Sequence, residues 1–145
     1  MKKQNVIIAD NNRFFREGLK FVLLNLGNVS IVGEAENGMQ LLQMMQATDA
    51  DIVFMDIAMP GMSGVDTVQA GHRVQPETTF IAFTSFENQR YIRRMVAAGV
   101  GGYLIKSSDN SEVLQEIVAD RRKRFFLSPG MVNQKLNSDI LNRKY

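Results

Sequence analysis

The sequence contains no cysteine and no tryptophan, and only three of its 145 residues are proline. The absence of cysteine excludes disulfides, thiol catalysis, and zinc or iron–sulfur sites built on cysteine ligands. No stretch approaches the ~18 apolar residues that a membrane-spanning helix requires. The apolar run near the amino terminus is too short for a signal peptide. We therefore expect a cytoplasmic protein that does not contact the membrane.

The composition is that of a globular domain, with 45% hydrophobic and 22% charged residues. A chain of 145 residues is long enough for one domain with a substantial core. The net charge of +2 is unevenly distributed, because basic residues are concentrated after residue 119. A basic tail can contact nucleic acid, but a solvated helix end or linker is the more common role of such a segment.

Apolar runs alternate with helical patterns along the whole chain. The central run, residues 52–55, is apolar throughout and ends at Asp56, which a Pro-Gly turn follows. Such a run predicts a strand buried on both faces, as in a parallel sheet. Further strands are expected at residues 6–9, 30–35, 79–83 and 103–105, and helices at residues 13–26, 64–74, 88–98 and 109–124. Another helix is expected after Asn37-Gly38, carrying Leu41, Leu42 and Met45. The helix at residues 109–124 is expected to open with a capping box formed by Asp109 and Glu112.

Five strand–helix alternations predict an α/β fold in which one parallel sheet lies between two layers of helices. The expected strand order is 2-1-3-4-5, as in flavodoxin-like (βα)5 three-layer sandwiches. We assign residues 1–126 to this domain and residues 127–145 to a C-terminal linker or sixth helix. Ser128 and Pro129 suit the start of that extra C-terminal helix, and Val132, Leu136 and Ile140 would form its apolar stripe.

Four of the five predicted strands end in a polar residue, namely Asp10, Asp56, Thr84 and Lys106. Because the carboxyl ends of parallel strands meet at one edge of a sheet, we expect these side chains to lie close together. Two neighbouring carboxylates repel each other unless a cation lies between them, and Mg²⁺ favours such oxygen ligands. A Lys ammonium and a Thr hydroxyl would hold phosphoryl oxygens. The set therefore favours phosphoryl transfer to a carboxylate.

The same residues carry a resemblance to the receiver domains of bacterial two-component response regulators, most closely those that precede a LuxR-type helix-turn-helix. The resemblance spans about residues 5–130 and includes five separate motifs in the expected order. These are Ile8-Ala9-Asp10 with Phe15-Arg16-Glu17-Gly18-Leu19, Asp56 to Gly64, Thr84-Ser85, Ala98-Gly99 through Gly102 to Ser107, and Leu127-Ser128-Pro129.

The resemblance implies a role for each matching residue. Asp56 would be the phosphoacceptor, and Lys106 and Thr84 would contact the phosphoryl group. Asp10 and the backbone carbonyl of Ala58 would serve Mg²⁺ together with Asp56. Tyr103 would be an aromatic switch that turns inward when Thr84 moves.

The chain departs from the family pattern at Asn11, where members usually have a second acidic residue that ligates the metal directly. An Asn carbonyl oxygen can still ligate Mg²⁺, but without a full negative charge. We therefore expect weak Mg²⁺ binding at Asn11, and phosphorylation of Asp56 that is slow or demands high Mg²⁺. The alternative is an atypical receiver regulated without phosphorylation, by dimerisation or by a bound ligand.

The resemblance implies a regulatory phosphoacceptor domain, which is no enzyme although it assists its own phosphorylation and dephosphorylation. Expected partners are a sensor histidine kinase or a small phosphodonor, and a second copy of the chain. DNA would be bound only through a C-terminal domain absent from this chain. A flavin mononucleotide binder shares the predicted fold. The carboxylate of Asp10 argues against it, because it would repel the phosphate of the cofactor.

Overall fold

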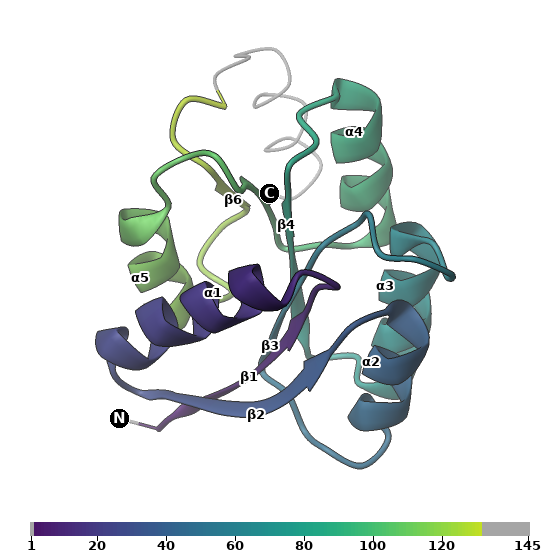
Figure 1. Cartoon of the computed structure of the whole chain (residues 1–145), viewed down its shortest axis with the longest axis horizontal. Helices are drawn as coiled ribbons and strands as arrows, with labels where there is room; N and C mark the ends of the chain where they lie inside the picture. Colours follow the sequence, from purple (N-terminus) through teal and green to yellow (C-terminus); the bar gives the residue numbers. More distant parts are fainter. Residues whose placement is uncertain (1, 132–145) are drawn as a thin grey trace.

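The computed structural model describes residues 2–131, which form a six-stranded parallel sheet with helices on both faces (Figure 1). The strand order is β2-β1-β3-β4-β5-β6. The strands are β1 (Gln4–Ala9), β2 (Val29–Ala35), β3 (Ile52–Met55), β4 (Thr79–Thr84), β5 (Gly102–Ile105) and β6 (Phe126–Leu127). The helices are α1 (Arg13–Leu26), α2 (Gly38–Met45), α3 (Gly64–Val74), α4 (Gln89–Ala98) and α5 (Ser111–Ala119). The predicted order 2-1-3-4-5 is confirmed, and β6 is an additional strand beside β5.

Two apolar cores, one on each face of the sheet, explain why the central strands are apolar throughout. Figure 1 shows α1 and α5 on one face and α2, α3 and α4 on the other. Successive residues of a strand point to opposite faces. In β3, for example, Phe54 packs in the core under α1 and α5, while Val53 and Met55 pack in the core under α2, α3 and α4. The fold is therefore the three-layer arrangement that the sequence predicts.

Four helices begin at a side-chain cap, which is a local sequence signal. The side chains of Asn12, Asn37, Ser63 and Asn88 each accept a hydrogen bond from a backbone N–H of the first turn. These bonds satisfy donors that a helix leaves unpaired at its start. Helices α1 and α3 consequently have the bounds predicted from the sequence. No helix of residues 2–131 is long and apolar enough to cross a membrane.

Helix α5 is shorter at both ends than predicted. The prediction that Asp109 and Glu112 form a capping box is wrong, because α5 begins at Ser111. The Asp109 carboxylate instead accepts hydrogen bonds from the hydroxyl and the backbone N–H of Ser111, at 2.6 and 3.1 Å. The helix ends at Ala119, so the basic run that follows lies in the loop before β6 rather than on the helix.

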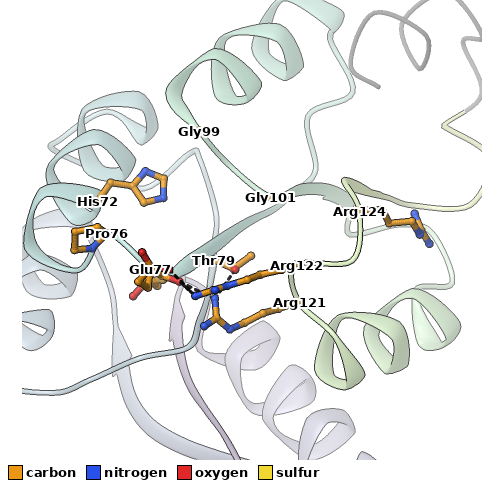
Figure 2. A pocket seen from close by; sticks show the side chains of 10 residues that line it. His72, Pro76, Glu77, Thr79, Gly99, Gly101, Arg121, Arg122 and Arg124 are labelled. Atoms are coloured by element: carbon orange, nitrogen blue, oxygen red, sulfur yellow. Dashed lines mark hydrogen bonds and ion pairs between the residues drawn. The ribbon is translucent and has the colours of Figure 1, made fainter. Parts of the chain in front are cut away.

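This basic loop binds the start of β4, at the edge of the sheet opposite the polar strand ends. Arg121 donates to the backbone carbonyl of Glu77 at 2.6 Å and to Thr79 Oγ1 at 2.9 Å, and Arg122 pairs with the Glu77 carboxylate at 2.8 Å. Figure 2 shows both guanidinium groups directed at Glu77. Burial, together with the charge of Arg122, lowers the pKa of Arg121. These arginines therefore make intramolecular contacts that join the loop to the sheet.

The segment after β6 also differs from the prediction. Ser128 does not cap a helix that starts at Pro129: Ser128 is buried, and residues 129–130 form a turn. Strand β6 crosses the boundary expected between residues 126 and 127, so the sheet includes residue 127; the division of the chain into domains stays a prediction. The stripe expected at Val132, Leu136 and Ile140 lies outside the described residues.

Candidate functional site

The carboxyl ends of β1, β3, β4 and β5 form the candidate site, because these four strands are neighbours in the sheet. Asp10 and Asp56 directly follow β1 and β3, Thr84 ends β4, and Lys106 directly follows β5. Backbone hydrogen bonds keep the strand ends in register. The N–H of Asp56 donates to the carbonyl of Ala9 at 3.0 Å, and that of Lys106 donates to the carbonyl of Thr84 at 2.8 Å.

The ammonium group of Lys106 joins two carboxylates at the centre of this edge. Its Nζ lies 2.6 Å from Asp10 Oδ2 and 2.9 Å from Asp56 Oδ2. Nζ also lies 4.2 Å from the centroid of the Phe15 ring, a cation–π distance. Burial acts to lower the pKa of Lys106, but the hydrogen bonds and charges of the two carboxylates outweigh it, so the pKa is raised. Lys106 is therefore charged at neutral pH.

Each carboxylate is fixed through its second oxygen by a nearby backbone N–H. Asp10 Oδ1 accepts from the N–H of Asn12 at 2.8 Å, and Asp56 Oδ1 accepts from the N–H of Ala58 at 3.0 Å. The exposed fractions are 1% for Asp10 and 7% for Asp56. Asp56 is thus the more accessible of the two.

The hydroxyl of Thr84 is buried and has no hydrogen-bond partner among residues 2–131. A buried polar atom without a partner costs free energy, and a functional site is a common reason for retaining one. Tyr103 on the neighbouring strand is also buried, and its hydroxyl donates to the carbonyl of Phe86 at 2.7 Å. Burial, with a smaller contribution from the charge of Asp56, raises the pKa of Tyr103. The tyrosine ring is therefore inward and its hydroxyl is bound to the loop after β4.

Asn11 and Ala58 are exposed beside the two aspartates. Within residues 2–131, no three His, Cys, Asp or Glu side chains come close enough together to hold a metal ion. Mg²⁺, however, is usually bound by one or two carboxylates and completes its shell with water and phosphate oxygens. Asp10 and Asp56 fit this requirement, with the Asn11 amide and the Ala58 carbonyl as uncharged oxygen donors.

Arg16 supports the site, although the sequence did not identify it. Its guanidinium donates to the backbone carbonyl of Asp10 at 2.6 Å and pairs with Glu34 at 3.2 Å. The side chain is almost fully buried. A signal was present, because Arg16 precedes Leu19 and Leu23 by three and seven residues and so lies on the buried face of α1. An arginine on an apolar face indicates a buried acceptor.

Comparison with known proteins gives a family match over most of the chain. A family model described as "Response regulator receiver domain" matches residues 6–118. The chain is 30% identical over 110 residues to "Uncharacterized transcriptional regulatory protein YhcZ" of Bacillus subtilis, covering 76% of this chain and 51% of that protein. It is 27% identical over 129 residues to "Response regulator GacA" of Pseudomonas syringae, covering 89% and 60%. The chain thus spans little more than half the length of these curated relatives.

Solved structures with the same fold include two related proteins. A LuxR-family two-component response regulator from Aurantimonas sp. SI85-9A1 has a TM-score of 0.85 at 25% identity, with 95% of this chain and 98% of that chain covered. The signal receiver domain of the putative response regulator NarL from Mycobacterium tuberculosis has a TM-score of 0.78 at 27% identity, with 86% and 100% covered.

Proposed function

The chain belongs to the response regulator receiver domain family, and on this premise we propose that it is a signalling switch controlled by phosphorylation of Asp56. The observation that carries the proposal is the ammonium of Lys106, bound at 2.9 Å to Asp56 and at 2.6 Å to Asp10. The partnerless hydroxyl of Thr84 on the intervening strand supports it. Transfer of a phosphoryl group to Asp56 requires an acceptor carboxylate, a cation to stabilise the added charge, and a donor to a phosphoryl oxygen. Asp56, Lys106 and Thr84 would provide these three groups.

In the proposed reaction, a carboxylate oxygen of Asp56 attacks the phosphorus of a phosphohistidine or of a small acyl phosphate. The new O–P bond forms as the bond from phosphorus to the donor breaks, and the donor leaves with that electron pair. Lys106 stabilises the added negative charge, and the Ala58 N–H keeps the carboxylate oriented. The enzyme-like part of this chain is limited to assisting its own phosphorylation and dephosphorylation.

Mg²⁺ is the proposed cofactor, held by Asp10, Asp56 and the Ala58 carbonyl, with Asn11 as a weak ligand. When bound, it would neutralise charge on the phosphoryl oxygens. Lys106 already neutralises part of the charge of the two carboxylates. Because Asn11 adds no charge of its own, we infer that this site binds Mg²⁺ weakly.

Thr84 and Tyr103 are the proposed switch. A phosphoryl oxygen on Asp56 would supply the partner that the Thr84 hydroxyl lacks. In the ladder between β4 and β5, Ala82 pairs with Tyr103, and Thr84 lies two residues further along β4. Movement of Thr84 would therefore alter the packing of Tyr103 on the adjacent strand. Through its bond to the Phe86 carbonyl, Tyr103 would pass the change to the loop before α4.

The partners follow from family membership and stay proposals. We infer a sensor histidine kinase or small phosphodonor upstream, and a second copy of the chain as the dimer partner. DNA would be bound through a C-terminal domain. Residues 1–126 would be the receiver, which β6 extends to residue 127, and the residues that follow would be a linker or sixth helix. A cytoplasmic location suits such partners.

The test is the mass of the intact chain after incubation with acetyl phosphate and Mg²⁺. We expect the mass of one phosphoryl group to be added to the wild type and not to Asp56→Ala. Equal labelling of both proteins would place the acceptor elsewhere. Absence of labelling at saturating Mg²⁺ would instead support regulation without phosphorylation.

A further inference from the structure

Two buried polar side chains, Ser128 and Asn110, enclose the backbone of Ile105, the residue directly before Lys106. The N–H of Ile105 donates to Ser128 Oγ at 2.7 Å. The Ser128 hydroxyl donates in turn to Asn110 Oδ1 at 2.6 Å, and Asn110 Nδ2 donates to the carbonyl of Ile105 at 2.9 Å. Both polar groups of the Ile105 backbone are therefore bound by these two side chains.

The side-chain oxygen of Ser128 and both polar side-chain atoms of Asn110 have hydrogen-bond partners in this network. Asn110 Nδ2 uses its second hydrogen for the carbonyl of Ser108, at 3.1 Å. The exposed fractions are 3% for Ser128, 6% for Asn110 and 1% for Ile105. At such burial, loss of the Ser128 hydroxyl would leave the Ile105 N–H and Asn110 Oδ1 without these bonds, which costs more than the bonds alone. The Ile105 carbonyl has a further donor, because it also accepts the N–H of Ser108 at 3.1 Å. The geometry of the network is consequently well determined.

Ser128 continues the sheet beyond β6 by means of its side chain. The last backbone pairs between β5 and β6 are Gly102 with Phe126 and Tyr103 with Leu127. The Ser128 hydroxyl then takes the place of a strand carbonyl and accepts the N–H of Ile105. On the other side of β5, the N–H of Lys106 is bound by the carbonyl of Thr84. The end of β5 is thus held from both sides.

We propose that Ser128 and Asn110 are positioning residues for Lys106, a role that rests on the proposed phosphorylation of Asp56. The Lys106 ammonium must reach two carboxylates at once, at 2.6 and 2.9 Å. A charged group that serves phosphoryl transfer must be held to within about 0.5 Å of its working position. The hydrogen bonds to Ile105 restrain the backbone from which the Lys106 side chain extends. Because Ser128 lies beyond β6, they also connect the site to the segment that follows this strand.

The first test uses nuclear magnetic resonance of the unphosphorylated 145-residue chain. In Ser128→Ala, the amide of Ile105 should exchange with solvent at least tenfold faster, and the ammonium signal of Lys106 should broaden as its ion pairs loosen. The matched control is Thr78→Val, which removes another buried hydroxyl, bonded at 2.7 Å to the Ala50 carbonyl, at the opposite edge of the sheet. An unchanged Lys106 signal in Ser128→Ala would overturn the proposal.

The second test is a double-mutant cycle on the rate of labelling by acetyl phosphate. Ser128→Ala should slow labelling about threefold to tenfold, and should have no further effect in a Lys106→Ala background, because the two residues act as a unit. Asn110→Ala should behave in the same way, whereas Thr78→Val should be additive with Lys106→Ala. Equal slowing by Ser128→Ala in both backgrounds would show a purely structural role.

The two tests separate failure of this proposal from failure of the proposed function. If the wild type is not labelled, phosphorylation at Asp56 is contradicted, while the resonance of Lys106 still decides whether Ser128 positions it. If the wild type is labelled and neither test responds to Ser128→Ala, only the positioning role fails.

Discussion

Among the residues of the site, Lys106 determines the electrostatics, because its ammonium is shared by Asp10 and Asp56. Two nearly buried carboxylates without a cation between them would repel each other. One positive charge cannot neutralise both, so a net negative charge remains for a metal ion to balance. Because Asn11 is uncharged, this net negative charge is smaller than it would be with a third acid at that position.

The first residue-scale prediction concerns Asn11→Asp. A third carboxylate at the edge of the site should tighten Mg²⁺ binding by about 1–2 kcal/mol, or roughly fivefold to thirtyfold in the dissociation constant. Titration calorimetry of the wild type and the variant measures it. Gln69→Glu, which also adds one charge but on the exposed face of α3, controls for net charge. Equal Mg²⁺ affinities of wild type and Asn11→Asp would contradict the prediction.

The second residue-scale prediction is that Thr84→Val stabilises the resting protein and impairs phosphorylation. The hydroxyl is buried without a partner, so replacing it with a methyl group of similar shape should raise the free energy of unfolding by about 1 kcal/mol. Labelling of Asp56 should slow, since a phosphoryl oxygen loses its contact. Urea unfolding and intact mass measure the two effects. A loss of stability would mean that the hydroxyl has a partner in solution.

At the scale of elements, ion pairs join α1 to β2, the edge strand of the sheet. Arg16 and Lys20 of α1 both bind the Glu34 carboxylate, at 3.2 and 2.9 Å. The hydrogen bond from Lys20 lowers the pKa of Glu34 although burial opposes it, and Arg16 acts in the same direction as Lys20. This edge strand is more polar than its neighbours, and these contacts replace part of the packing that central strands have on both faces.

The pH dependence of stability should report this contact. Because the pKa of Glu34 is lowered on folding, its contribution is present above its ordinary value of 4.5 and is lost as the pH falls through the lowered pKa. Glu34→Gln should therefore flatten the loss of stability between about pH 5 and pH 3. Urea unfolding across this range measures it, with the exposed Glu87→Gln as control. Parallel curves for wild type and Glu34→Gln would refute the assignment.

The packing of α3 on β4 gives a second prediction at this scale. A Cβ at Gly71 would lie 2.4 Å from the ring of Phe80, which is fully buried and cannot retreat. Gly71→Ala should destabilise the fold by about 1–3 kcal/mol through overpacking. Gly18 in α1 has open space around the same position, so Gly18→Ala should stabilise by about 0.5–1 kcal/mol. Thermal unfolding of both variants should show opposite shifts.

At the scale of the whole molecule, the two edges of the sheet have different tasks. The carboxyl edge carries Asp10, Asp56 and Lys106, whereas the amino edge carries the contacts of Arg121 and Arg122 with Glu77, seen in Figure 2. The two apolar cores lie between these edges. The candidate site and the arginine contacts are therefore at opposite ends of the strands.

We predict that phosphorylation changes the association of the chain. The face next to the site carries the aromatic pair Phe86 and Tyr91, 43% and 40% exposed. Repacking of Tyr103 would move the carbonyl of Phe86 to which it is bound. Light scattering should give a larger mass after treatment with acetyl phosphate and Mg²⁺ in the wild type, and no change in Asp56→Ala. A mass that is independent of phosphorylation would contradict this prediction.

The alternation of strands and helices could be predicted from the residues alone, as could the strand ends at Asp10, Asp56 and Lys106. Apolar runs, side-chain caps and glycine stops are local signals, read within a few residues. Three features could be found only in the folded chain. One ammonium binds both carboxylates, the Thr84 hydroxyl has no partner within residues 2–131, and Ser128 extends the sheet instead of starting a helix. Such contacts join segments far apart in the chain, and they depend on packing that no local pattern specifies.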